Sequence, residues 1–255
     1  MTALRERVVV GPRCIRSYRG QQVCADTDLH ERALDRLRAH VPSGARVADV
    51  GCGRAAFSLR MADAGYEVAG LDVIPTGELE AADALAYHEV DLFDPATRDA
   101  FARDHRAAFD AVVLLEVIEH VHDPWQTLTF ARELLRPGGA LLLSTPNITS
   151  FFSRFRFLTA GRFHQFEPPD LSYGHVNPMT PFMVETVLAQ TGFELVDKGP
   201  GPPMPVVVWD RNVPSVGLRL FNALGWLVAA ALTPLMRGGD LDGWSLFYVA
   251  RTTTT

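Results

Sequence analysis

The chain of 255 residues is 47% hydrophobic and 21% charged, with a formal net charge of −6. This length favours one elaborated domain over two full domains, and the composition is that of a globular protein with a good core. The net charge is negative, whereas general nucleic-acid binding usually requires a basic surface, so we do not expect a nucleic-acid partner. Cys14, Cys24 and Cys52 form no metal-type CxxC pair, and Val8–Val10 is too short for a signal-peptide core. We therefore expect a cytoplasmic protein.

The first 45 residues are predicted to form an N-terminal cap. Val8–Val10 is interpreted either as a short edge strand or as part of this cap. A helix is predicted from Asp28 to Val41, because its apolar residues recur at helical spacing and Pro42-Ser43-Gly44 follows. Asp28 and Glu31 have the spacing of a capping box at its start.

The stretch from Arg46 to Asp72 predicts a β-loop-α-β unit. Val47–Val50 is a short apolar strand, and it ends at the turn Gly51-Cys52-Gly53. A helix then runs to Gly65, and a second strand finishes on Asp72. Such a unit binds a nucleoside-containing cofactor, with the carboxylate at the second strand on the ribose hydroxyls.

Charge indicates which cofactor this unit binds. Gly51-x-Gly53-x-x-Ala56 also fits the dinucleotide fingerprint, in which bare amides at the helix N-terminus receive a pyrophosphate. Asp49 lies two residues before Gly51, at the strand end, where it would repel a pyrophosphate. A carboxylate there suits a cationic amino group with no phosphate beside it. The sequence therefore predicts S-adenosylmethionine, and NAD-dependent oxidoreduction is disfavoured.

The later strands alternate with helices, which predicts a parallel sheet covered on both faces. Ligands in such sheets bind outside the carboxyl ends of the strands. Helices are predicted at 78–86 and 123–136, and strands at 87–91, 109–115, 140–144, 192–198 and 244–251. Several acids fall at the ends of the predicted strands, and their shared position indicates a binding edge: Asp49, Asp72, Asp91 and Glu116.

These motifs resemble those of class I S-adenosylmethionine-dependent methyltransferases, in the branch of the ubiquinone-biosynthesis O-methyltransferases and bacterial small-molecule and glycan methyltransferases. The resemblance rests on VADVGCG, GLDV, Asp91-Leu92, EVIEHV and LLRPGGALLLSTPN. It implies a Rossmann-like, doubly wound, mostly parallel seven-stranded α/β sheet with an antiparallel last strand. One departure is Ala55, which stands where the family usually has a third glycine.

The resemblance also assigns cofactor-binding roles to residues of this chain. Asp49 and the backbone of Gly51, Cys52 and Gly53 would hold the methionine portion of S-adenosylmethionine. Asp72 would bind the ribose hydroxyls, and Asp91 with Leu92 would flank the adenine. Val73 and Glu116 complete the expected cofactor-binding set.

The segment after the fourth strand carries the expected chemistry. His120 has a suitable pKa for a general base, and the neighbouring Glu119 is placed to orient it. The alternative is that Glu119 and His120 only cap the following turn. In some relatives a Glu-x-x-Glu-His pattern with a distant histidine binds a divalent metal, and His175 is the candidate partner here. Zinc, manganese and iron accept such ligands, and the sequence leaves metal dependence open.

Two insertions are expected to determine which acceptor the protein binds. The first, residues 147–180, is predicted to be a lid; its segment Phe151–Phe166 has six Phe, three Arg and no acid, which suits an apolar acceptor with an anionic group. The alternative is a helix that packs on the core with exposed arginines. The second, residues 200–240, contains the uncharged run 220–236. The stretch 218–237 is interpreted as a membrane-interface segment, a segment packed on the domain or an oligomer contact.

The sequence thus predicts a methyltransferase that O-methylates a small or lipid-linked acceptor, such as a saccharide hydroxyl or a quinone-type phenol. Peripheral association with the inner face of the membrane is part of this hypothesis. Two alternatives stay open: an RNA 3′-terminal 2′-O-methyltransferase and a non-catalytic cofactor-binding domain.

Overall fold

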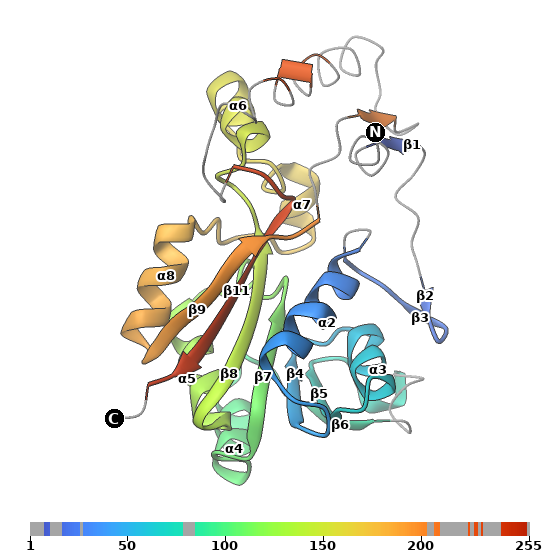
Figure 1. The fold of residues 1–255 in the computed structure, drawn as a ribbon, viewed down its shortest axis with the longest axis vertical. Helices are drawn as coiled ribbons and strands as arrows, with labels where there is room; N and C mark the ends of the chain where they lie inside the picture. Colours follow the sequence, from blue (N-terminus) through green and yellow to red (C-terminus); the bar gives the residue numbers. More distant parts are fainter. Residues whose placement is uncertain are drawn as a thin grey trace.

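The computed structural model describes residues 8–10, 17–25, 28–78, 85–202, 207–209, 224, 227–228, 231 and 241–253. Its centre is a seven-stranded sheet in the order β6-β5-β4-β7-β8-β11-β9 (Figure 1). The strands are β4 Arg46–Val50, β5 Glu67–Asp72, β6 Ala86–Glu89, β7 Phe109–Leu115, β8 Leu135–Pro146, β9 Phe193–Pro200 and β11 Ser245–Thr252.

The direction of the strands confirms the predicted fold class. Strands β4 to β8 pair in parallel with one another, whereas β11 lies antiparallel between β8 and β9. Parallel strands need helical crossovers, and these helices bury both faces of the sheet. The five parallel strands therefore end at one edge, which we call the carboxyl edge.

Side chains of the central strands alternate between two cores. Val112 and Leu114 of β7 face one cluster, and Ala111 and Val113 face the other, as the two-residue period of a strand requires. Helices α4 Pro95–Asp104, α5 Pro124–Leu134 and α8 Pro181–Gln190 contribute to the first cluster. Helices α2 Leu29–His40 and α3 Ala56–Asp63 contribute to the second. A 3₁₀ turn, η1 Thr76–Glu78, follows β5.

Additional elements surround this sheet. Helices α6 Phe151–Ala160 and α7 Pro168–Ser172 lie beyond the carboxyl edge, at the top of Figure 1. A hairpin of β2 Ser17–Tyr18 and β3 Gln21–Gln22 packs against α3. Strand β1 Val8–Val10 pairs in parallel with β10 Val207–Trp209 and forms a separate two-stranded sheet. None of the helices in the described part of the chain is long and apolar enough to cross a membrane.

Three local predictions differ from the structure. Asp28 precedes α2 but makes no side-chain cap; its carboxylate accepts a hydrogen bond from Arg32 Nε at 2.7 Å, so the predicted capping box is wrong. Helix α5 ends at Leu134, and the predicted stop at residues 137–139 lies inside β8. The register between β7 and β8 shifts there, which accommodates the extra residues. Most of the predicted helix 78–86 lies outside the described residues, and Ala86 begins β6.

Candidate active site

The glycine turn after β4 has the backbone that its sequence predicts. Gly51 and Gly53 both have positive φ, at 72° and 54°. A Cβ on Gly51 would lie 2.6 Å from a methyl of Val117, so only glycine fits against the segment that follows β7. Gly53 N donates to Asp72 Oδ2 at 2.7 Å, which joins the turn to the end of β5.

Ala55, the departure from the family's third glycine, occupies the left-handed region with φ 61° and is fully buried. It is the N-cap residue of α3. An alanine in this conformation costs about 1–2 kcal/mol relative to the right-handed region. The glycine-like backbone is therefore kept although the side chain is not glycine.

The acids of the next strands lie along the same carboxyl edge. Asp72 Oδ1 accepts from Val73 N at 2.8 Å, and the Val73 side chain is exposed. Asp91 Oδ1 accepts from the amide two residues on, while Leu92 packs partly buried on the core. Tyr87, which sequence reasoning missed, donates to Ile74 O at 2.6 Å and braces the segment after β5.

Asp49 is buried rather than open at the strand end. Its Oδ2 accepts from Ser58 Oγ on α3 at 2.6 Å. Burial raises the pKa of Asp49 to about 7, the Ser58 hydrogen bond lowers it, and the nearby Asp72 carboxylate raises it further. Ser58 was missed, although a serine on the apolar inner face of a helix is a signal of a buried polar partner. Asp49 thus changes charge close to neutral pH.

Glu116 joins three strands at the end of β7. Its φ is 53°, a strained conformation for a residue with a side chain. Its Oε1 accepts from Ser144 Oγ of β8 at 2.7 Å, and its Oε2 accepts from Ser245 Oγ of β11 at 3.0 Å. Both carboxylate oxygens of this predicted cofactor residue therefore already receive hydroxyl hydrogen bonds.

Glu119 is fully buried one short turn later. Its Oε2 accepts from Thr145 Oγ1 at 3.1 Å, but its Oε1 has no hydrogen-bond partner among the described residues. Burial raises the pKa of Glu119 well above its ordinary value, and the neighbouring Glu116 raises it further. A buried carboxylate oxygen without a donor is costly unless a cation or a ligand supplies one.

The structure brings the distant His175 beside Glu119 and His120, as the sequence predicted. The two imidazole rings are perpendicular, with centroids 4.7 Å apart. One donor atom from each of the three residues lies within 4.8 Å of the others. Burial lowers the pKa of His120 and His175 adds to this effect, while hydrogen bonding of the ring to the backbone of Gly174 and Tyr173 opposes it.

A backbone carbonyl fixes the orientation of the His175 ring. His175 Nδ1 lies 2.8 Å from the carbonyl oxygen of Gln165, to which it donates. This bond leaves Nε2 as the unprotonated nitrogen of the neutral ring. A backbone carbonyl behind the ring is typical of histidines that ligate metals. Together with the unpartnered oxygen of Glu119, this arrangement fits a divalent cation.

Two of the three arginines in the predicted lid, residues 147–180, have partners within the same segment. Arg156 forms an ion pair with Glu167 at the start of α7, and Arg154 Nε donates to Thr149 O at 2.7 Å. Phe152 is buried, whereas Phe157 and Leu158 at the end of α6 are exposed. The sequence did not reveal that Glu167 would bind one of the three arginines.

A glycine turn after β4 and acids at the carboxyl ends of the neighbouring parallel strands are the arrangement of class I S-adenosylmethionine-dependent methyltransferases. The comparisons with known proteins agree. The profile of the family described as "Methyltransferase domain" matches residues 16–198, more than half of the chain. The chain therefore belongs to this methyltransferase family.

Curated relatives share about half of the chain. The ubiquinone biosynthesis O-methyltransferase of Aromatoleum aromaticum is 37% identical over 112 residues, 41% of this chain and 45% of that protein. The protein of the same name from Cereibacter sphaeroides strain KD131 is 39% identical over 140 residues, 52% of each chain. This chain spans about half the length of the curated relatives it matches.

Solved structures agree in fold. A SAM-dependent methyltransferase from Archaeoglobus fulgidus is 20% identical and superposes with a TM-score of 0.58, over 88% of this chain and 94% of that one. At this identity the likeness concerns the fold alone.

Proposed function

We propose that the chain transfers a methyl group from S-adenosylmethionine to a hydroxyl of a small or lipid-linked acceptor. The relatives named ubiquinone biosynthesis O-methyltransferase support oxygen as the methylated atom and a quinone-type phenol as one acceptor class. The observation that carries the proposal is the buried Glu119, which lies beside two imidazoles at the carboxyl edge. Nothing in a cofactor-binding domain without catalysis needs this cluster.

Methyl transfer is a direct displacement at a sulfonium, and the cofactor brings the methyl group already activated. The protein has two tasks: to align the acceptor oxygen with the methyl group and to remove its proton. His120 suits the second task because burial lowers its pKa and so favours the neutral imidazole, which can accept a proton. Glu119 and His175 surround it and would orient the acceptor hydroxyl.

A divalent ion of the zinc, manganese or iron kind would be held by Glu119, His120 and His175. The unpartnered Glu119 oxygen and the carbonyl-oriented His175 support this assignment. When bound, such an ion would take His120 as a ligand, and it would replace the imidazole base by lowering the pKa of the acceptor hydroxyl. The sequence alternative, in which Glu119 and His120 merely cap a turn, does not account for a buried carboxylate without a donor.

The exposed apolar side chains beyond the carboxyl edge favour a lipid-linked acceptor. Leu158 of α6 is 83% exposed and Tyr173, directly after α7, is 78% exposed. Both helices lie beyond the carboxyl edge (Figure 1). Most of the stretch 218–237 lies outside the described residues, but its described members are exposed: Leu224, Leu227, Val228 and Ala231. We propose that this end contacts the inner face of the membrane, where a lipid-linked acceptor would reside.

A flotation assay with liposomes tests this contact. The full chain is expected to float with the vesicles, and a variant without 218–237 is expected to lose the association. If the deletion instead halves the sedimenting mass and leaves flotation unchanged, the stretch is an oligomer contact.

One incubation separates the acceptor classes. Labelled S-adenosylmethionine and cell extract are incubated with the protein, and the extract is then divided into lipid, small-molecule and RNA fractions. Label in the lipid or small-molecule fraction is expected, and it should fall when a chelator is added. Label in RNA would favour the 2′-O-methyltransferase alternative. Cofactor binding without label in any fraction would favour the non-catalytic domain.

A further inference from the structure

The cluster is assembled from two separate parts of the chain. Glu119 and His120 belong to the turn 117–121 after β7, whereas His175 belongs to residues 174–177, which we call the strap. The strap follows α7 at the end of the lid. Something must hold the strap against the turn, because the three donor atoms converge only when these two segments meet.

Backbone bonds make the first connection. The amides of Val176 and Asn177 both donate to the carbonyl oxygen of Glu119, at 3.0 and 2.9 Å. The strap therefore attaches to the same residue whose carboxylate enters the cluster. His175 lies next to these two donors in the strap, so its position follows from them.

The side chain of Asn177 makes the second connection. Its Nδ2 lies 3.4 Å from the carbonyl oxygen of Ile118 and 3.4 Å from that of Val121. A side-chain amide carries two N–H donors, so one group can bridge both carbonyls. Asn177 thus spans the turn on both sides of Glu119. Aspartate, which has the same shape, has no donor when ionised.

The strap also approaches the turn unusually closely. Gly174 has φ 93°, and a Cβ there would lie 3.1 Å from His120 Nδ1. Gln165, which orients His175 through its carbonyl, has φ 65° and donates from its side chain to Trp244 O at 3.3 Å. Gln165 orients the ring of His175. The backbone bonds between the strap and Glu119 determine how close this ring lies to the Glu119 carboxylate.

We infer that Asn177 is a positioning residue, which locks the strap onto the turn 117–121 so that His175 faces Glu119 and His120. It touches neither the cofactor nor the acceptor in this role. The inference rests on the proposed function of the cluster. Its consequence is that the lid supplies part of the chemistry, and the site is complete only while the strap is attached.

Two variants test the inference, Asn177→Asp and the milder Asn177→Ser, which keeps one donor. Ser172→Ala is the matched control, because it removes one side-chain bond to a carbonyl within the same lid and does not touch the turn. Amide hydrogen exchange of Val176 and Asn177 is expected to be slow in the wild type. It should accelerate about tenfold in Asn177→Asp and less in Asn177→Ser. The control should match the wild type.

A second measurement reports on the cluster itself. Calorimetric affinity for Mn²⁺ alone is expected to fall about tenfold in Asn177→Asp, while affinity for S-adenosylmethionine stays at the wild-type value. A purely structural role would lower thermal stability without this separation of the two affinities. Strap amides that exchange quickly in the wild type, or equally in Asn177→Asp and Ser172→Ala, would overturn the inference. Absence of Mn²⁺ binding by the wild type would reject the proposed metal instead, and hydrogen exchange would still decide the role of Asn177.

Discussion

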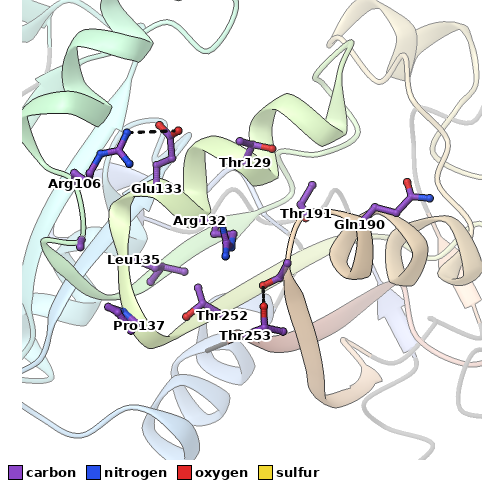
Figure 2. A pocket seen from close by; sticks show the side chains of 12 residues that line it. Arg106, Thr129, Arg132, Glu133, Leu135, Pro137, Gln190, Thr191, Thr252 and Thr253 are labelled. Atoms are coloured by element: carbon purple, nitrogen blue, oxygen red, sulfur yellow. Dashed lines mark hydrogen bonds and ion pairs between the residues drawn. The ribbon is translucent and has the colours of Figure 1, made fainter. Parts of the chain in front are cut away.

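The two ends of the central sheet carry polar groups in different ways. At the amino end, α5, α8 and the last residues of β11 enclose a groove of about 870 Å³, lined among others by Arg106, Arg132, Glu133 and Thr253 (Figure 2). Its groups are exposed or paired with one another: Arg106 lies 3.9 Å from Glu133, and Thr253 Oγ1 donates to a backbone carbonyl at 3.2 Å. At the carboxyl edge, Glu119 is fully buried and one of its oxygens has no partner among the described residues.

This difference shows that a buried polar group without a partner, rather than a large open volume, identifies the candidate active site. Exposed ion pairs contribute little to the free energy of folding, so the polar groups of the groove cost the fold little without a ligand. A buried carboxylate without a donor is unfavourable, and a bound cation or ligand would offset its cost. The comparison predicts that variants at the carboxyl edge change function and that matched variants at the amino end do not.

The largest effect is expected from Glu119→Gln. The variant removes the carboxylate beside His120, on which proton removal is proposed to depend, and should lower kcat by about 10²–10⁴-fold, the range of general-base catalysis. Folding should be preserved, because burial already favours the neutral form of Glu119. Glu133→Gln in the groove is the control and should keep wild-type kcat. Equal kcat for both variants would contradict the assignment of the cluster.

A smaller loss is expected from Asp72→Ala, which removes the proposed ribose ligand. Affinity for S-adenosylmethionine, measured by calorimetry, should fall about 10–100-fold, because hydrogen bonds to a charged group contribute about 1.5–3 kcal/mol. Asp110→Ala is the matched control, since Asp110 is a carboxylate at the amino end that binds Arg136 and the amide of Arg46. Unchanged affinity in Asp72→Ala would remove Asp72 from the cofactor site.

A pH dependence is expected from Asp49. Its pKa of about 7 in the free protein means that the carboxyl is partly protonated below neutral pH. A cationic cofactor favours the ionised form, so binding below pH 7 must also release a proton. Affinity for S-adenosylmethionine should therefore weaken from about pH 7 to 5, by at most about tenfold per unit, and Asp49→Asn should abolish this slope. A slope that persists in Asp49→Asn would assign it to another group.

The smallest effect is expected on stability, from glycine substitutions of two alanines with positive φ, one at each end of the sheet. Ala107 has φ 53° and is exposed at the amino end, whereas Ala55 has φ 61° and is buried beside the glycine turn. Ala107→Gly should raise the free energy of unfolding by about 0.5–1 kcal/mol, because relief of the left-handed strain exceeds the entropy cost of glycine. Ala55→Gly should be close to neutral, since it also loses a buried methyl group. Thermal denaturation of the two variants measures the difference.

The sheet was largely predictable because its strands have simple patterns. The apolar run from Phe109 to Leu115 coincides with β7, since a strand buried on both faces excludes polar residues along most of its length. The bounds of β8 were harder. Its Pro137–Gly139 segment has the composition of a turn, yet it forms part of the strand where the register shifts and Thr252 Oγ1 accepts from Gly138 N at 2.8 Å.

The site was predictable only in part. Glu119, His120 and His175 have side chains suited to proton transfer or metal binding, so their types and a resemblance were enough to single them out. Gln165 and Asn177 are ordinary polar residues, and their roles depend on contacts with residues outside their own segment. Asn177, for example, acts on a turn more than fifty residues earlier. Local sequence contains no signal for such a pairing. Ser58 bonds to the nearby Asp49, and its place on the inner face of α3 was the one available signal.

The antiparallel placement of β11 has a consequence for how this molecule can vary. Residues on either side of the stretch 203–243 are bonded to each other: Gly201 N donates to Ser245 O at 2.8 Å, and Trp244 N donates to Pro202 O at 2.7 Å. The stretch therefore leaves the sheet and re-enters it at one point, where its two flanking segments are bonded to each other. Lengthening or shortening such a loop changes its closure entropy only slowly. A change of length within the stretch is therefore expected to leave the pairing of β11 with β8 and β9 in place.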